Sequence, residues 1–196
     1  GLWPDVQLLA QQAQDFIQGP PVGDIPPVQL SRHVWMVYAP DGFPTPENRG
    51  MMSNVIFVVT SAGVVILDSG SSLQIGQMVI RMIRQVTPLP VVGVFNSHFH
   101  GDHINGLRKK DGTATFPNAE VMVPEAEYAF WMDEARMNNA PEAMKGAFRG
   151  VHFALDPIAK DVKRFAWDKE ILPGITTVRA EGHTPGHTAF VLASGK

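Results

Sequence analysis

Two kinds of hydrophobic spacing recur along the chain, and together they predict a mixed α/β protein. Short apolar runs bounded by turn-forming residues are typical of β-strands. Such runs cover residues 33–38, 54–59, 64–67, 91–95, 119–123, 175–179 and 188–192. The second and third runs flank a short turn and predict a hairpin, whereas the uninterrupted apolar run at 91–95 predicts a buried strand.

Helical spacing is found in the segments between these runs. Apolar residues recur every three or four positions in residues 73–86, which predicts an amphipathic helix. Pro124 can occupy the first turn of a helix that we expect to reach about residue 138. We also expect helices over residues 141–150 and 157–165. Strands mixed with helices in this way predict a layered α/β architecture in which helices pack on a sheet.

The beginning of the chain differs in character from the rest. Residues 1–30 combine a short amphipathic stretch with a connector rich in proline and glycine. We interpret them as an N-terminal arm that packs on one domain formed by residues 31–196. No basic segment followed by an apolar one, and hence no signal peptide, is visible at the N-terminus, which leaves open that one has been removed already. A cytoplasmic and a periplasmic location both stay open.

Composition narrows the classes of partner. The chain is 44% hydrophobic and 18% charged, as expected of a globular protein. Its formal net charge of -3 comes without a basic block, which argues against nucleic acid as a partner. No apolar run approaches the about 20 residues that span a bilayer, so we expect no membrane partner. The chain has no cysteine, and any metal must therefore be held by His, Asp or Glu.

The chemistry concentrates in residues 96–103, which contain the pattern His-x-His-x-Asp-His. Three imidazoles and a carboxylate so close together are costly to bury unless a partner satisfies them, and a cation can satisfy them all. Residues two apart in extended backbone point the same way, so His98 and His100 can converge on one ion. Gly101 allows the backbone to bend, after which Asp102 and His103 point towards a second ion.

A second motif, Gly-His-Thr-Pro-Gly-His-Thr, occupies residues 182–188 and follows the strand predicted at 175–179. A catalytic zinc needs three protein ligands and one open position for water. We therefore expect His183 to complete the set begun by His98 and His100. His187 is expected to support a ligand or to be structural, because a ligand imidazole usually needs its other nitrogen fixed by a partner.

Three further residues have two interpretations each. Asp68 ends a predicted strand and could orient one of the imidazole rings, or it could simply form the turn of Asp-Ser-Gly. Phe130 and Trp131 could line an apolar substrate pocket. At their helical spacing they could equally belong to the hydrophobic core.

The two histidine motifs together resemble those of the metallo-β-lactamase superfamily. The resemblance covers most of the chain, from about residue 33 to residue 196. It implies an αβ/βα sandwich, of which this chain would cover the N-terminal αβ half and the start of the second half. It also implies that His98, His100 and His183 hold one metal, and that Asp102 and His103 hold another. Two zinc ions are expected in the complete enzyme.

The second half of the chain is similar to one branch of that family, the methyl parathion hydrolase-like hydrolases. The similar stretches are 97–107, 116–119, 130–132 and 181–188. The first half, including residues 49–54 and 65–72, looks more like generic hydrolases of the superfamily.

The resemblance also identifies what the chain lacks. Family members continue with a Gly-Asp turn, whose Asp bridges two metals, and later with a final His. No Asp or Glu follows Glu181, and no His follows His187. By the family pattern we expect a C-terminally truncated domain that is by itself a weak catalyst or none. The pattern leaves a homodimer open.

The resemblance implies a zinc-dependent hydrolase that acts on a small-molecule ester, lactone or phosphotriester. The attacking group would be a metal-bound hydroxide, because a cation lowers the pKa of bound water to about 7. Asp102 would be catalytic as well as a ligand, since it could orient that water. Three alternatives stay open: a β-lactam hydrolase of the same superfamily, a di-iron oxidoreductase and an inactive metal-binding fragment. Iron sites of this kind usually replace an imidazole by a carboxylate, which disfavours the second alternative.

Overall fold

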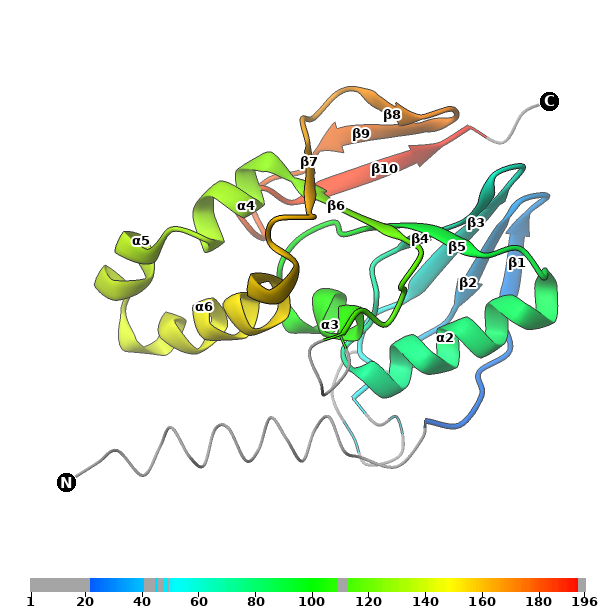
Figure 1. Ribbon diagram of the computed structural model, residues 1–196, viewed down its shortest axis with the longest axis horizontal. Helices are drawn as coiled ribbons and strands as arrows, with labels where there is room; N and C mark the ends of the chain where they lie inside the picture. Colours follow the sequence, from blue (N-terminus) through cyan, green and yellow to red (C-terminus); the bar gives the residue numbers. More distant parts are fainter. Residues whose placement is uncertain (1–21, 41–44, 46–47, 49, 109–112, 194–196) are drawn as a thin grey trace.

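The computed structural model describes residues 22–40, 45, 48, 50–108 and 113–193. They form two β-sheets with helices packed on the larger one (Figure 1). The strands are β1 (Val28–Ser31), β2 (Val34–Val37), β3 (Val55–Thr60), β4 (Gly63–Leu67), β5 (Val91–Phe95), β6 (Glu120–Pro124), β7 (Lys163–Phe165), β8 (Glu170–Leu172), β9 (Ile175–Arg179) and β10 (Thr188–Leu192). The helices are α2 (Leu73–Val86), α3 (Gly101–Ile104), α4 (Glu125–Trp131), α5 (Glu134–Asn139) and α6 (Glu142–Leu155), with short 3₁₀ turns at Asn105–Leu107 and Asp156–Ile158.

The larger sheet has seven strands in the order β1-β2-β3-β4-β5-β6-β7. Its first four strands are antiparallel neighbours, and β3 and β4 form the hairpin expected from the sequence. From β4 to β7 the neighbouring strands are parallel. The parallel strands β4 and β5 therefore end at the same edge of the sheet, and this edge carries the histidine motif.

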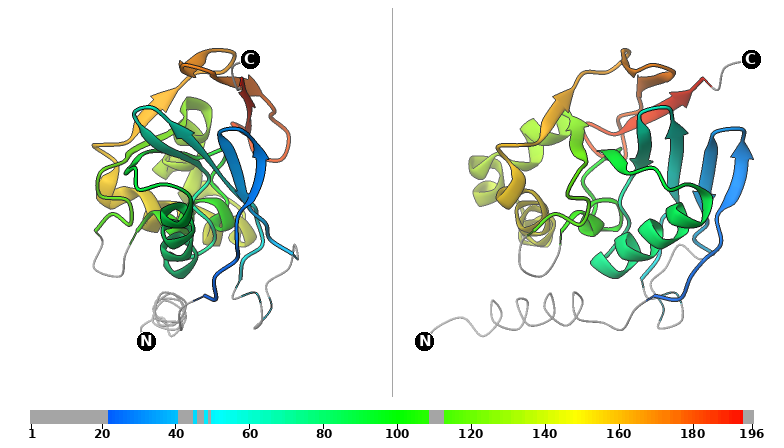
Figure 2. Two further views of the ribbon diagram at one scale, coloured as in Figure 1. Left: turned by 90° about the vertical axis from the view of Figure 1, so that its right-hand side faces the viewer. Right: turned by 45° about the vertical axis from the view of Figure 1, so that its right-hand side comes forward.

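The smaller sheet consists of β8, β9 and β10 in antiparallel order β10-β9-β8. It lies against the side of the larger sheet that faces away from α2 (Figures 1 and 2). Strand β4 shows the layering most clearly, because all of its residues are buried. Val64 and Ile66 belong to the core on the helical side, whereas Val65 and Leu67 belong to the core shared with the smaller sheet. Burial of both faces explains why this strand is apolar without alternation.

Helix α2 supplies much of the core on the helical side of the sheet. Its N-terminus is capped by Ser72, whose hydroxyl accepts a hydrogen bond from the backbone N–H of Ile75 at 3.2 Å. Apolar side chains at helical spacing face the sheet, as the sequence predicts: Ile75, Met78, Val79, Met82 and Ile83. A Cβ added to Gly76 would lie 2.8 Å from the carbonyl oxygen of Gly106, so this helix packs closely on the segment that follows the histidine motif.

One predicted helix is wrong. Residues 157–165 were expected to be helical, but only a short 3₁₀ turn at Asp156–Ile158 is present, and Lys163–Phe165 forms β7. The strand pairs in parallel with β6, so tertiary pairing overrides the local apolar spacing. The helix expected from residue 124 to about 138 is divided into α4 and α5, because Asp133 begins a new helix by accepting a hydrogen bond from the backbone N–H of Arg136.

Part of the expected N-terminal arm lies outside the described residues, including its amphipathic stretch. Of the remainder, Val22 is buried in the helical-side core, and Asp24 accepts hydrogen bonds from Arg81 of α2. Residues 28–31 form the edge strand β1, which the sequence patterns did not predict. No helix in the described ranges is long and apolar enough to cross a bilayer.

Candidate metal centre

Two segments of the chain, far apart in sequence, bring the histidines together. The first ligand segment, residues 96–103, leaves the end of β5 and runs into the short helix α3. The second ligand segment, residues 182–187, connects β9 to β10. The backbone N–H of Thr188 donates to the carbonyl oxygen of Ser97 at 3.0 Å, which ties the end of the second segment to the start of the first.

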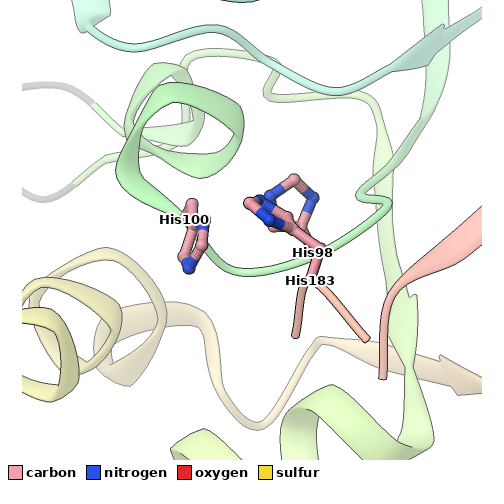
Figure 3. Close-up of side chains that lie close together, drawn as sticks. All are labelled: His98, His100 and His183. Carbon is pink, nitrogen blue, oxygen red and sulfur yellow. The ribbon is translucent and has the colours of Figure 1, made fainter. Parts of the chain in front are cut away.

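His98, His100 and His183 lie around one point, with a possible ligand atom of each within 4.8 Å of the others (Figure 3). Their ring centroids are separated by 4.8 Å between His98 and His100, 4.8 Å between His98 and His183, and 4.6 Å between His100 and His183. His98 is buried, His100 is half-buried and His183 is exposed. The structure thus assembles the three imidazoles that the two motifs predict.

The hydrogen bonds of His98 define which of its nitrogens is free. The Ser97 hydroxyl lies 2.8 Å from Oδ2 of Asp68 and 2.9 Å from Nδ1 of His98. A carboxylate only accepts, so the single hydroxyl proton goes to Asp68 and the hydroxyl oxygen accepts from Nδ1–H of His98. Nε2 then carries a lone pair, and it is buried without a hydrogen-bond partner. A metal ion would satisfy this orphaned atom, so the residues present fit such a group.

Burial first, and then the neighbouring imidazoles, lower the pKa of His98 to about 2. The pKa of His100 is lowered as well, mainly by burial and by His183. Both rings are therefore neutral at neutral pH in the metal-free protein. Since an imidazole must be neutral to bind a metal, these two residues need no deprotonation before they act as ligands.

Asp102 and His103 lie beside this group in a different electrostatic state. Nδ1 of His103 is 2.8 Å from Oδ2 of Asp68, and its Nε2 is 3.3 Å from Oδ2 of Asp102. Burial alone would lower the pKa of His103, but hydrogen bonds to the two carboxylates raise it to about 10. Burial likewise opposes ionisation of Asp102, yet the hydrogen bond from His103 holds the pKa of that carboxyl below its ordinary value.

Asp68 satisfies both of the interpretations that its sequence position allows. It lies after the end of β4 with a φ of 62°, a left-handed conformation that suits a turn. Its carboxylate also accepts from the backbone N–H of Ser97 at 2.8 Å, from the Ser97 hydroxyl and from His103. It therefore orients His103 directly and His98 through Ser97.

The backbone of the first ligand segment is held as firmly as its side chains. The carbonyl oxygen of His103 accepts from the backbone N–H and hydroxyl of Ser69 at 2.8 and 2.9 Å, and from Nδ2 of Asn96 at 2.8 Å. The Ser53 hydroxyl donates to the carbonyl oxygen of Asp102 at 2.6 Å. A Cβ on Gly106 would lie 1.9 Å from the carbonyl oxygen of Ser69, so only glycine fits this close approach.

The remaining candidate residues, His187, Phe130 and Trp131, all lie close to the three imidazoles or to the core beside them. The His187 ring lies 4.7 Å from that of His98 and 5.5 Å from that of His183, centroid to centroid. Trp131 is buried in the helical-side core and contacts Phe148, as the core interpretation predicts, with Phe130 packed beside it. The rings of Trp131 and His100 also lie near each other, with centroids 6.4 Å apart and an interplanar angle of 69°.

Two residues around the site were missed by the sequence analysis. Ser97 connects Asp68 to His98, and its position next to a predicted ligand was a usable signal. Glu127 is fully buried on α4 and binds the second ligand segment. Nothing local distinguishes Glu127 from a solvated glutamate on the same helix.

Residues 48–196 match the family described as the metallo-β-lactamase superfamily. The chain belongs to this superfamily. In sequence it is 23% identical over 120 residues to an N-acyl homoserine lactonase from Bacillus sp., a match that covers 60% of this chain and 40% of the lactonase. It is also 35% identical over 61 residues to a linear primary-alkylsulfatase from Pseudomonas sp. (strain ATCC 19151), covering 31% and 12% of the two chains.

Solved structures of the superfamily share the fold. AidC, a dizinc quorum-quenching lactonase in complex with a product, N-hexnoyl-L-homoserine, matches with a TM-score of 0.62 at 25% identity, covering 74% of this chain and 53% of AidC. The hydrolase AbOPH matches with a TM-score of 0.66 at 21% identity, covering 89% and 72%. The chain thus spans about half the length of AidC, and less of the Bacillus lactonase. These relatives do not test the resemblance to methyl parathion hydrolase-like enzymes, which stays a prediction.

Proposed function

We propose that this chain carries the metal site of a zinc-dependent hydrolase that acts on an ester, a lactone or a phosphotriester. The observation that carries the proposal is the convergence of His98, His100 and His183 around a buried imidazole nitrogen that has no partner. Three imidazoles with an open fourth position are the ligand set of catalytic zinc sites. The likeness to a dizinc lactonase and to an N-acyl homoserine lactonase supports a lactone or related ester as the substrate class.

In this proposal His98, His100 and His183 would hold one zinc ion, and Asp102 and His103 would contribute to a second. A bound zinc ion supplies a water of lowered pKa as nucleophile and polarises the scissile carbonyl or phosphoryl oxygen. The chain's own contribution is to hold the three imidazoles in place, with those of His98 and His100 neutral, and to leave Nε2 of His98 without a competing hydrogen bond. Asp102, which is partly exposed beside the three imidazoles, would orient the attacking water. Three imidazoles at the first ion favour zinc over a di-iron centre, because iron sites of this kind usually replace an imidazole by a carboxylate.

The test is to load the purified chain with zinc and to measure bound metal by mass spectrometry. Hydrolysis of an aryl ester, an acyl homoserine lactone and a phosphotriester is then followed. We expect zinc to be retained and at least one of the three substrates to be hydrolysed. The His98→Ala variant should lose both properties, whereas His33→Ala, which alters an exposed histidine, should keep them.

Each contrary result has a defined meaning. Zinc retention without hydrolysis of any of the three substrates would favour a non-catalytic metal-binding module over a hydrolase. Equal zinc retention by wild type and His98→Ala would show that the metal is held elsewhere.

A further inference from the structure

A buried carboxylate outside both histidine motifs lies between the two ligand segments. Glu127, on α4, is fully buried. A carboxylate in such a place is costly unless its oxygens are hydrogen-bonded. Burial raises the pKa of Glu127, while hydrogen bonding with Thr184, Gly186, Trp131 and Phe99 acts in the opposite direction. The residue therefore has partners that belong to the site rather than to solvent.

The strongest of these contacts are made with the second ligand segment. Oε1 of Glu127 accepts from the Thr184 hydroxyl and, at 3.0 Å, from the backbone N–H of Gly186. Thr184 directly follows His183 in the chain. One carboxylate oxygen of Glu127 thus binds the turn that immediately follows His183, a predicted metal ligand. Because Thr184 is the residue after His183, this contact restricts where the backbone of His183 can lie.

The packing of Gly186 strengthens the same contact. A Cβ added to Gly186 would lie 2.2 Å from the backbone nitrogen of Glu127, 2.7 Å from its Cγ and 2.8 Å from the carbonyl carbon of Ala126. Only glycine allows the turn to approach the first residues of α4 so closely. Within the turn, the backbone N–H groups of Gly182 and His187 both donate to the Thr184 carbonyl, at 3.2 and 3.4 Å. Both are longer than the 3.0 Å hydrogen bond from the Gly186 N–H to Glu127.

The same helix also contacts the first ligand segment. Burial raises the pKa of Glu127, and hydrogen bonding with the Trp131 indole and with the backbone of Phe99, between His98 and His100, opposes that rise. Oε2 of Glu127 and Nε1 of Trp131 make no hydrogen bond of regular geometry, so these contacts are weaker than those of Oε1. The ring of Trp131 also lies near that of His100. Helix α4 therefore connects the two segments that must converge on one ion.

We propose that Glu127 is a positioning residue that holds His183 at the distance from His98 and His100 needed for a shared metal ion. The inference rests on the metal site proposed above. Partners of metal-ligating residues typically affect metal affinity about 10–100-fold. Glu127 would act indirectly, because it binds the Thr184 hydroxyl and the Gly186 backbone and not the imidazole of His183.

The experiment measures zinc affinity by competition with a chromophoric chelator, and the visible absorption spectrum after replacement of zinc by Co²⁺. Glu127→Ala should lower zinc affinity about 10–100-fold and change the Co²⁺ spectrum, because His183 is no longer held as a ligand. Glu127→Gln keeps an oxygen that can accept from Thr184 and Gly186, and should restore most of the affinity. Glu125→Gln is the matched control, since it alters an exposed carboxylate on the same helix and should leave both readouts unchanged.

Folding and positioning are separated by a second variant. Thr184→Val removes only the hydroxyl donor, and should lower zinc affinity by several-fold while thermal unfolding of the metal-free protein stays cooperative. If Glu127→Ala fails to fold, Thr184→Val carries the test. Wild-type affinity and an unchanged Co²⁺ spectrum in the folded variants would overturn the role of Glu127. Failure of the wild-type chain to bind zinc would instead overturn the metal site itself.

Discussion

The two ligand segments reach the same point by different means. The first, residues 96–103, extends from a central parallel strand, and its side chains and carbonyls are fixed by Asp68, Ser69 and Asn96. The second, residues 182–187, is a turn between two strands of the smaller sheet, and a single buried carboxylate, that of Glu127, binds it to α4. The first ligand segment is thus a direct continuation of the larger sheet. The second ligand segment belongs to the smaller sheet and is bound to α4 by hydrogen bonds.

This difference indicates which ligand positions are fixed by the sheet and which depend on other contacts. Residues at the carboxyl ends of parallel strands inherit their positions from the sheet, so they are preorganised whenever the domain folds. The position of His183 depends on how the smaller sheet and α4 meet. The largest effects should come from removal of a ligand, and smaller effects from the surroundings of each segment.

Substitution of a ligand from each segment is the most severe test. His98→Ala and His183→Ala should each reduce zinc affinity by more than about 100-fold, because loss of a direct ligand exceeds the about 10–100-fold effect of losing a supporting partner. Titration against a competing chelator measures the change, with His33→Ala as the control. A small effect of His183→Ala beside a large one of His98→Ala would show that the second segment supplies no ligand.

Asp68→Asn tests the support of the first segment. Asp68 orients His103 directly and His98 through Ser97, so the variant should bind zinc about 10–100-fold more weakly. It should also lower the pKa of His103 from about 10 in the metal-free protein, because one of the two carboxylates that raise it becomes neutral. An NMR titration of the imidazole resonances measures this pKa. An unchanged pKa would show that Asp102 alone sustains the charged ring.

Gly106→Ala tests how rigid the framework around the first segment is. Because the new Cβ would lie 1.9 Å from the carbonyl oxygen of Ser69, the free energy of unfolding should fall by about 1–3 kcal/mol. Gly146→Ala is the matched control, since this glycine lies in α6 with no atom within 4 Å of the added carbon. The control should gain about 0.5–1 kcal/mol. Urea denaturation measures the free energy of unfolding of both variants. Equal free energies for Gly106→Ala and Gly146→Ala would contradict the close packing of Gly106 on Ser69.

The smallest effect concerns pH. The folded-state pKa of His98 is about 2, below the 6.5 of the unfolded chain. Below pH 6.5 the unfolded chain therefore binds a proton that the folded protein excludes, and stability is lost as pH falls. Between pH 6.5 and 5, His98 should contribute a fall of about 1 kcal/mol per pH unit to the free energy of unfolding of the metal-free protein. A His98→Asn variant should show a shallower dependence in thermal unfolding scans at several pH values.

The same difference between segments determines how much the sequence could predict. The strands around Val64–Leu67 and Val91–Phe95, and the three imidazoles, follow from local patterns because each pattern and its neighbours in the sheet favour the same structure. Strand β7 could not be predicted, since its apolar spacing fits a helix and only pairing with β6 makes it extended. Glu127 could not be predicted either, because its burial depends on a turn that lies 57 residues later in the chain.

The left-handed backbone of Asp68 restricts which sequences this site can explore. At a φ of 62°, β-branched and bulky side chains are strongly disfavoured, and glycine, which fits best, would remove the carboxylate. Asn tolerates the conformation but carries no charge to hold His103. The backbone conformation and the need for a charged partner of His103 therefore favour Asp at this position for independent reasons, and each of these replacements would be poorer in one respect or the other.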